Sequence, residues 1–209
     1  ITNVQPLKGE YDVTEAFVEV GVPVFMTDGG MSLDINAATR ITDYSTSGSE
    51  HTWQVGGAFR PVADLTFRGT VSRDIRAPNI GELFSTSRLF FSNVVDPFSG
   101  GVSRLVQVPE GGNPDLAPEE SDTVTLGIVY QPSWLEGVNF SADWYHIEIQ
   151  DAISSLPAQT IVDTCFELDQ LCELVTLENG ELARVQQNLF NVAERNIEGI
   201  DFEAVYTRP

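Results

Sequence analysis

Apolar and polar residues alternate one by one through much of this chain. The pattern is clearest in residues 53–60, 65–72, 123–130 and 200–206. Successive side chains of a β-strand point to opposite faces, whereas an α-helix repeats its faces about every 3.6 residues. The alternation therefore predicts half-buried strands, and we expect an all-β, antiparallel fold.

Seven strands are expected, and the connections between them favour a transmembrane β-barrel segment. Most of the predicted strands are near the ~9–11 residues that a tilted strand needs to cross a bilayer. One edge of the sheet carries connections of about 9, 4 and 6 residues, and the other edge carries connections of about 9, 45 and 47. Outer-membrane barrels combine short periplasmic turns with long external loops in this way. The predicted strand spans are about 15–23, 33–42, 52–60, 65–75, 121–131, 138–149 and 197–207.

The sixth predicted strand changes phase halfway along its length. Phe140 and Trp144 share one phase of the alternation, whereas Tyr145 and Ile147 share the other. A β-bulge near Trp144–Tyr145 would reconcile the two halves, and so would a strand that leaves the membrane at that point.

The polar faces of these strands fit two architectures equally well. In a secreted β-sandwich they would form the wet outside, and in a barrel they would line the lumen. Aromatic residues lie near several strand ends, where the aromatic girdles of a membrane barrel belong. The polar-face residues are Asp34, Asn36, Arg40, Gln54, Arg60, Arg68, Asp201 and Glu203, and the aromatic residues are Trp53, Phe59, Tyr130, Trp144 and Tyr206.

The charge of the chain excludes some classes of partner. The chain has 11 basic and 31 acidic side chains, for a net charge of −20. Nucleic-acid binding and docking onto anionic lipid both need a basic surface, so neither is expected. No apolar run is long enough for a transmembrane helix, which needs about 20 residues. Because bacterial barrels have an even number of strands, and the chain opens at Ile1 without a leader, we expect a fragment or a processed chain.

The two cysteines predict a disulfide within a broken helix. Residues 157–173 have helical spacing, with Ser155 as a candidate N-cap. One continuous helix would place Cys165 and Cys172 about 10.5 Å apart at ~1.5 Å per residue, whereas a disulfide needs Cα atoms roughly 4.4–6.8 Å apart. We therefore expect a break near Asp169–Gln170 with the bridge formed, and free thiols are the alternative.

Motifs for metal or enzyme chemistry are missing from the sequence. A zinc site would need two more ligands beside the cysteines, and the only histidines, His51 and His146, are far away in the chain. The sequence has no nucleophile elbow, zinc-protease motif, phosphate loop or EF-hand loop. A carboxylate pair of the glycosidase type stays open only as a chance arrangement among the acids. We expect no enzyme activity, no cofactor and no metal site.

Four segments resemble, in order, sequence signatures of the TonB-dependent outer-membrane receptors. They are residues 73–84, 113–122, 143–153 and 196–204. The resemblance covers about residues 11–207 and implies a 22-stranded barrel, of which residues 1–209 are a part. The plug domain, the TonB box and the terminal aromatic strand are not visible in the sequence. The residues that carry the match are Arg76, Ala77, Pro78, Asn113, Pro114, Pro118, Glu119, Gly199 and Asp201.

The resemblance implies a receptor that takes up a scarce solute across the Gram-negative outer membrane. Siderophores, cobalamin and carbohydrates are the expected solute classes. The implied partners are outer-membrane lipid and lipopolysaccharide, a small-molecule ligand, and the TonB complex through the missing N-terminal part. The alternatives are a passive outer-membrane barrel and a secreted β-sandwich binding module.

Two sets of residues are candidates for ligand contact. Long loops at about 76–120 and 150–196 would overhang the mouth of the barrel, and in the first of them Arg88, Phe90 and Phe91 combine a cation with aromatic surface. That combination suits a catecholate or carboxylate siderophore, or a sugar, and a loop tucked against the barrel rim is the alternative. The second set would line the lumen as a route for anionic ligands, or would pair with Glu15, Glu19, Asp34 or Asp74. It consists of Arg40, Arg68 and Arg73.

A short helix is expected directly after the fourth strand. Pro78 disfavours helical geometry at Ala77, which marks the end of the strand. Asn79 followed by Glu82 has the spacing of a capping box.

Overall fold

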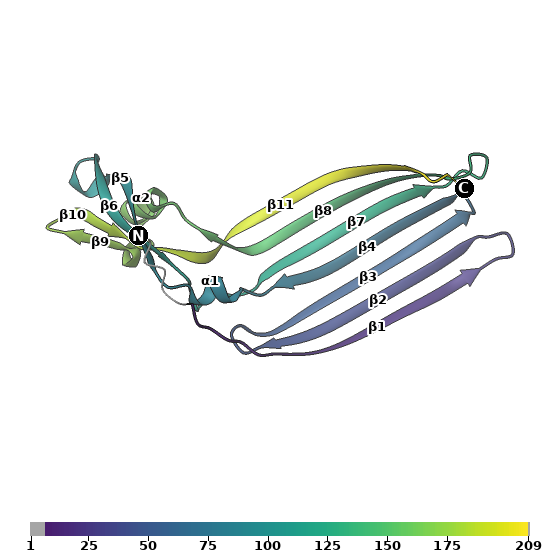
Figure 1. The fold of residues 1–209 in the computed structure, drawn as a ribbon, viewed down its shortest axis with the longest axis horizontal. Helices are drawn as coiled ribbons and strands as arrows, with labels where there is room; N and C mark the ends of the chain where they lie inside the picture. Colours follow the sequence, from purple (N-terminus) through teal and green to yellow (C-terminus); the bar gives the residue numbers. More distant parts are fainter. Residues whose placement is uncertain (1–6, 209) are drawn as a thin grey trace. The chain divides into compact units, whose positions relative to one another are not determined.

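The structure is a computed structural model that describes residues 7–208. The described chain forms two compact units (Figure 1). The first, called the wall unit here, consists of residues 12–76, 118–151 and 194–208. The second, called the loop unit, consists of residues 7–11, 77–117 and 152–193.

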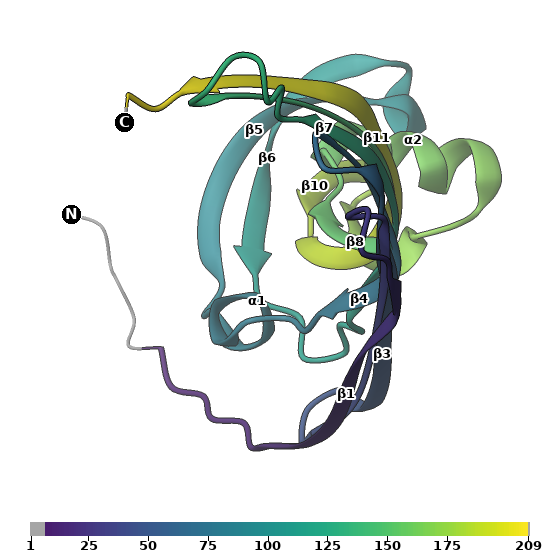
Figure 2. The same cartoon turned by 90° about the vertical axis from the view of Figure 1, so that its right-hand side faces the viewer.

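The wall unit is one curved, open sheet, and Figure 2 shows its strands following an arc. The strand order is β1-β2-β3-β4-β7-β8-β11, and the neighbours from β1 to β8 run antiparallel. Each predicted strand overlaps one of these strands, so the all-β expectation is confirmed, and the pairing is mostly antiparallel. The bounds are β1 Val13–Met26, β2 Ser32–Tyr44, β3 Gly48–Val62, β4 Leu65–Arg76, β7 Glu119–Tyr130, β8 Val138–Ser155 and β11 Gln187–Tyr206.

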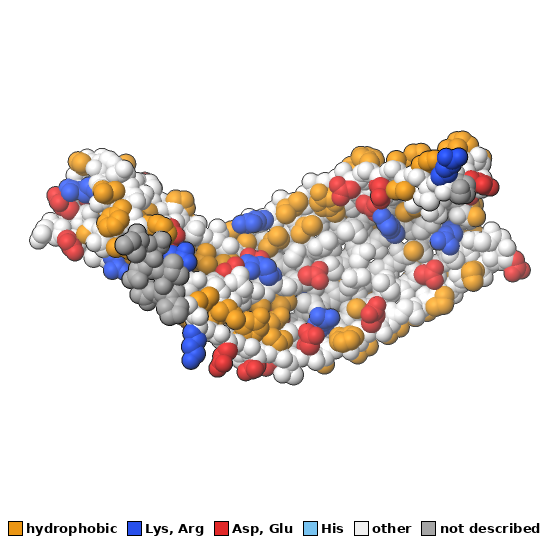
Figure 3. All heavy atoms as spheres, in the orientation of Figure 1, with side chains coloured by type: hydrophobic (Ala, Val, Ile, Leu, Met, Phe, Trp, Pro, Cys, Tyr) orange, Lys and Arg blue, Asp and Glu red, His pale blue; other side chains and the backbone are white. Residues whose placement is uncertain are grey.

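The pairing register assigns every strand residue to one face of the wall, because residues opposite each other on neighbouring strands share a face. One row across the strands is Ala58–Arg68–Gly127–Asp143. The next row, on the other face, begins with Phe59 and continues through the apolar residues of β4, β7 and β8. The first row belongs to the concave face, where charged side chains are spread over the hollow of the wall (Figure 3).

The convex face is apolar and uncovered. Leu126 is 58% exposed and Phe202 is 80% exposed. In a β-sandwich such side chains would be buried against a second sheet, and no second layer covers them among residues 7–208. The sandwich alternative is therefore wrong. None of the helices within residues 7–208 has the length and apolar character to cross a membrane.

The phase change in β8 has a different cause from the predicted bulge. The register between β7 and β8 is continuous from Tyr130–Phe140 to Glu120–Gln150, so the bulge prediction is wrong. Tyr145, Ile147 and Ile149 instead point to the concave face. Gly199 accommodates the first of them, because a Cβ there would lie only 2.5 Å from the Tyr145 hydroxyl.

The loop unit contains a small sheet and two helices. The hairpin of β5 (Arg88–Asp96) and β6 (Val102–Gly111) surrounds a 3-10 turn, η1 (Pro97–Ser99), and β10 (Glu181–Val185) pairs with both β6 and β9 (Val175–Glu178). Helix α2 (Ala158–Leu168) packs against this sheet. The core they share consists of Val94, Val106, Val108, Ala158, Ile161, Val162, Leu182 and Val185.

Helix α1 (Ile80–Phe84) begins with the predicted capping box. The side chain of Asn79 accepts a hydrogen bond from the Glu82 backbone N–H, and the Glu82 carboxylate accepts one from the Asn79 N–H. Leu83 of this helix is buried against Leu116 and Ile153, which fixes the helix to the rest of the loop unit.

The second helix ends where a break was predicted. Asp169 follows α2 in the left-handed conformation, with φ 55°, and Leu171 has φ 62° before the 3-10 turn η2 (Cys172–Leu174). This reversal brings the Cα atoms of Cys165 and Cys172 to 4.8 Å, and the structure joins the two residues in a disulfide. The predicted N-cap at Ser155 is wrong, because the N-cap position is Pro157 and has no side-chain hydrogen bond.

Candidate functional site

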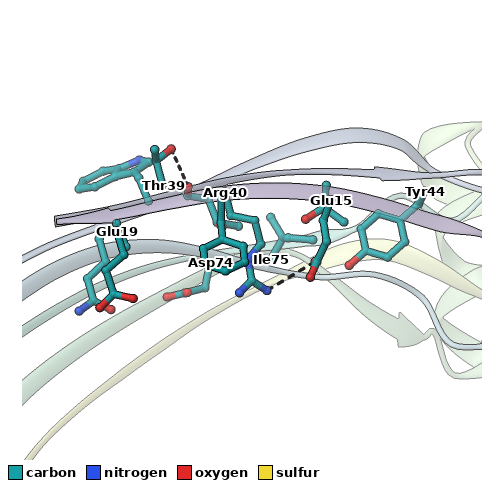
Figure 4. Close-up of a pocket in the computed structure, with 13 residues that line it drawn as sticks. Glu15, Glu19, Thr39, Arg40, Tyr44, Asp74 and Ile75 are labelled. Atoms are coloured by element: carbon teal, nitrogen blue, oxygen red, sulfur yellow. Dashed lines mark hydrogen bonds and ion pairs between the residues drawn. The ribbon is translucent and has the colours of Figure 1, made fainter.

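The concave face of the wall holds a pocket of about 370 Å³ near the β4 end that leads into α1. Arg40 lies at its centre, and its Nη1 is 3.6 Å from Oε2 of Glu15. The guanidinium also lies 5.5 Å from the ring centroid of Phe17, in a cation–π contact. Glu19 and Asp74 line the same side of the sheet (Figure 4). Pairing of Arg40 with Glu15 was one of the predicted alternatives, and it is confirmed.

A second ion pair crosses strand β7 on the same face. The Arg68 guanidinium donates two hydrogen bonds to Asp143, with Nε to Oδ1 at 2.8 Å and Nη2 to Oδ2 at 2.6 Å. Gly127 lies between the two residues in the register, and it leaves the space that the bridge occupies. A Cβ at Gly127 would collide with Asp143 Oδ1 and would lie 2.9 Å from Arg68 Nε.

Replacing Gly127 with alanine should break this bidentate bridge. We expect the full-length receptor to lose about 1 kcal/mol of stability, because partly exposed ion pairs contribute little and the added methyl group forces local rearrangement. Thermal unfolding in detergent micelles measures the loss. Gly21→Ala is the matched control, since a Cβ added at Gly21 would have no atom within 4 Å. Equal melting temperatures for the two variants would contradict the prediction.

Arg73 does not lie on the concave face with Arg40 and Arg68. It pairs in register with Trp53 and Asp122, on the convex face. There it donates two hydrogen bonds to Asp122, at 2.8 and 2.6 Å, and lies 3.4 Å from Glu120. The prediction that Arg73 lines the lumen with Arg40 and Arg68 is therefore wrong. The alternation itself carried the signal, since Arg73 is in phase with the apolar residues of β4.

The three candidates in the loop unit lie on different faces of β5. Arg88 and Phe90 pair with Glu110 and Val108, whereas Phe91 pairs with Gln107 on the opposite face. The structure therefore does not bring the three side chains together as one surface. Ligand contact by any of them stays a prediction.

Several residues of the family-like segments make local contacts. Arg76 and Glu119 form a two-point ion pair at 2.7 Å that joins the ends of β4 and β7. Asn113 donates to the Leu189 carbonyl at 2.9 Å and accepts from the Asp115 N–H at 3.0 Å. Pro78 lies between β4 and α1, Pro114 and Pro118 lie between β6 and β7, and Asp201 lies two residues after Gly199 on β11. These contacts fix the points where the chain enters and leaves the wall.

Residues 7–208 contain no group of three or more histidine, cysteine or acidic side chains arranged to hold a metal ion. The concave face presents charged, hydrogen-bonding and aromatic side chains.

A curved antiparallel sheet with an apolar convex face and a charged concave face is the wall of a membrane β-barrel. The chain belongs to the family described as "TonB dependent receptor-like, beta-barrel", whose model matches residues 5–207. This confirms the resemblance seen in the four sequence segments. Proteins of this family are receptors and transporters of the Gram-negative outer membrane.

Solved structures of such receptors share the fold. The siderophore receptor PirA from Acinetobacter baumannii is 20% identical, with a TM-score of 0.64 over 94% of this chain and 26% of that one. A mutant of the ferric enterobactin receptor PfeA from Pseudomonas aeruginosa, in complex with enterobactin, is 16% identical, with a TM-score of 0.66 over 92% of this chain and 24% of that one. The Serratia marcescens hemophore receptor HasR, in complex with HasA and heme, is 13% identical, with a TM-score of 0.60 over 95% and 32%.

This chain thus spans about a quarter to a third of the receptors it resembles. No curated protein sequence matches it.

Proposed function

We propose that the chain is one part of an outer-membrane receptor that imports a scarce solute with energy delivered by TonB. Residues 1–209 would supply part of a barrel of about 22 strands, with the long connections at 76–120 and 150–196 facing the outside. The plug and the TonB contact would belong to the rest of the receptor. The observation that carries the proposal is the opposition of the two faces of one sheet, apolar outside and charged inside.

The distribution of aromatic residues on the convex face supports a membrane position. Tyr130 and Phe140 pair at the end of the wall that carries the short β7–β8 turn. Further along the same face, the rings of Trp144 and His146 stack at 6.3 Å, opposite Leu126 and Val124 of β7. The convex residues of β7 from Val124 to Ile128 are apolar, as a lipid-facing band requires.

The solute class is the open part of the proposal. The structural neighbours bear the names of siderophore and hemophore receptors, and one of them is bound to enterobactin. They support a metal chelate as the first class to test, ahead of cobalamin and carbohydrates.

Uptake by whole cells tests the proposal. A strain that expresses the full-length receptor is offered ferric siderophores, heme, cyanocobalamin and maltodextrins, each labelled, in the presence and absence of TonB. We expect one class to accumulate only with the receptor and TonB together. Accumulation that depends on the receptor but not on TonB would favour a passive barrel and would contradict the proposal.

A further inference from the structure

The small sheet of the loop unit has a cavity on its open face, with a volume of about 560 Å³. The residues that β5 and β6 contribute to it lie on the face of the hairpin opposite the core that α2 covers. Its lining comes entirely from the loop unit and consists of Phe91, Leu105, Gln107, Glu173, Leu174, Thr176, Glu178, Ala183, Arg184 and Gln186.

Two large apolar side chains in this cavity are uncovered. Phe91 is 60% exposed and Leu105 is 67% exposed. They lie on the opposite face of the hairpin from the buried Val94 and Val106. Most of the other lining residues are polar or charged, so the cavity combines an apolar patch with groups that can fix the orientation of a small molecule.

The basic residue that lines the cavity, Arg184, is hydrogen-bonded to a neutral side chain and keeps its positive charge. Arg184 donates a hydrogen bond to Oε1 of Gln186 at 3.2 Å. The amide nitrogen of Gln186 is itself used, because it donates to the Pro109 carbonyl at 3.2 Å and to Asn188 Oδ1 at 2.8 Å. The carboxylates of Glu173 and Glu178 have no hydrogen bond or ion pair with any other residue in the described part of the chain. Two carboxylates against one guanidinium thus leave the lining with a net negative charge, beside the apolar side chains of Phe91 and Leu105.

The surroundings of the cavity strengthen this negative charge. The loop unit carries four basic side chains against eleven acidic ones. One of the four, Arg104, is bound to two acids, at 3.1 Å from Asp96 and 2.6 Å from Glu181. A surface with such an excess of one sign attracts ligands of the opposite charge and repels those of its own.

We infer that this cavity binds a cationic solute that also presents apolar surface, with Phe91 and Leu105 contacting the apolar part and Glu173 and Glu178 facing the positive charge. The inference rests on the proposed function, since it names the solute class of that receptor. It differs from the sequence-based expectation of an anionic catecholate or carboxylate siderophore near Arg88.

A matched series of ligands isolates the effect of charge. Ferrioxamine B carries a protonated amine on a largely apolar scaffold, its N-acetyl derivative is neutral, and its N-succinyl derivative is anionic. Equilibrium binding of each to the purified full-length receptor, at low and at high salt, gives the order of affinities. We expect the cationic form to bind about tenfold more tightly than the anionic form at low salt, and this preference should shrink as salt screens the charges.

Variants of the cavity tie this preference to the proposed residues. Glu178→Gln should lower the affinity for ferrioxamine B about fivefold, as expected for one partly exposed charge pair, and leave that of the neutral derivative unchanged. Phe91→Ala should weaken all three ligands alike. Glu167→Gln is the control, because Glu167 is an exposed acid on α2 outside the cavity.

An anionic derivative that binds as tightly as the cationic one, or the absence of saturable binding by ferrioxamine B, would overturn the inference. Neither result would bear on TonB dependence, which the uptake experiment measures with its own panel of solutes. A receptor that imports an anionic chelate with TonB would thus retain the proposed function and refute the cationic site.

Discussion

Replacing Leu126 with arginine should strongly reduce the amount of folded receptor in the outer membrane. Leu126 lies near the middle of the apolar run on the convex face of β7 and is exposed there. Arginine near the centre of the lipid-facing band of a barrel costs about 2–4 kcal/mol. The heat-dependent shift in gel mobility of the full-length receptor measures the folded fraction in isolated outer membranes.

Thr125→Arg provides the matched control for this experiment. Thr125 is the neighbouring residue on the same strand, and it pairs with Thr70 and Tyr145 on the concave face. An arginine there would meet water and polar groups rather than lipid, so we expect a much smaller loss. Equal losses for the two variants would show that the convex face does not contact hydrocarbon.

Replacing Asp96 with alanine should destabilise the loop unit by about 3–5 kcal/mol, the cost of leaving the partners of a buried charge unpaired. Asp96 is 0% exposed. Its carboxylate accepts hydrogen bonds from the Leu182 N–H at 2.9 Å, the Phe98 N–H at 3.0 Å and the Ser99 hydroxyl at 2.6 Å. It thereby joins the β5–β6 hairpin to β10.

Hydrogen exchange of the full-length receptor, followed by mass spectrometry, can localise this loss. Peptides from β5, β6 and β10 should exchange faster in Asp96→Ala, and peptides from β2 and β3 should not change. Ser92→Ala is the control, because it alters another polar residue of β5 that is outside the buried network. Unchanged exchange in the loop unit would contradict the assigned role.

The same carboxyl group predicts how the loop unit responds to acid. Burial raises the pKa of Asp96, but the hydrogen bonds from Leu182, Ser99 and Phe98 outweigh burial and hold it below the ordinary value of 3.8. The ionised form therefore contributes stability above about pH 4, and this contribution is lost as the pH falls toward the lowered pKa. The protection factors of β10 amides, which correct for the slower intrinsic exchange in acid, should fall in this range for the natural protein, and less so for Asp96→Asn.

The alternation of residues was enough to predict the wall, because a strand with lipid on one side and polar surroundings on the other must repeat every second residue. The break after α2 was also predictable, since the geometry of a disulfide is incompatible with a continuous helix. The loop unit was not predictable in the same way. Its core depends on contacts between β5, β6, α2 and β10, which come from two distant parts of the chain.

The partners of the arginines could not be predicted either, because they too come from distant parts of the chain. Asp143 was not among the candidates for Arg68, because the two residues are 75 positions apart and meet only through the register of three strands. In β8, the sequence suggested either a bulge or a strand that leaves the membrane at Trp144–Tyr145, to account for the change of phase at Tyr145 and Ile147. A concave face can hold apolar side chains where a small neighbour such as Gly199 leaves room.

The disulfide has a consequence for recognition. Cys172 immediately precedes Glu173, so the bond that closes the end of α2 also holds this carboxylate at the rim of the cavity. A receptor exported without oxidation of its thiols would keep its barrel but present a loosened acidic rim. On the proposed function, oxidation of these two thiols would affect solute binding at the cavity and leave the strands of the wall unchanged.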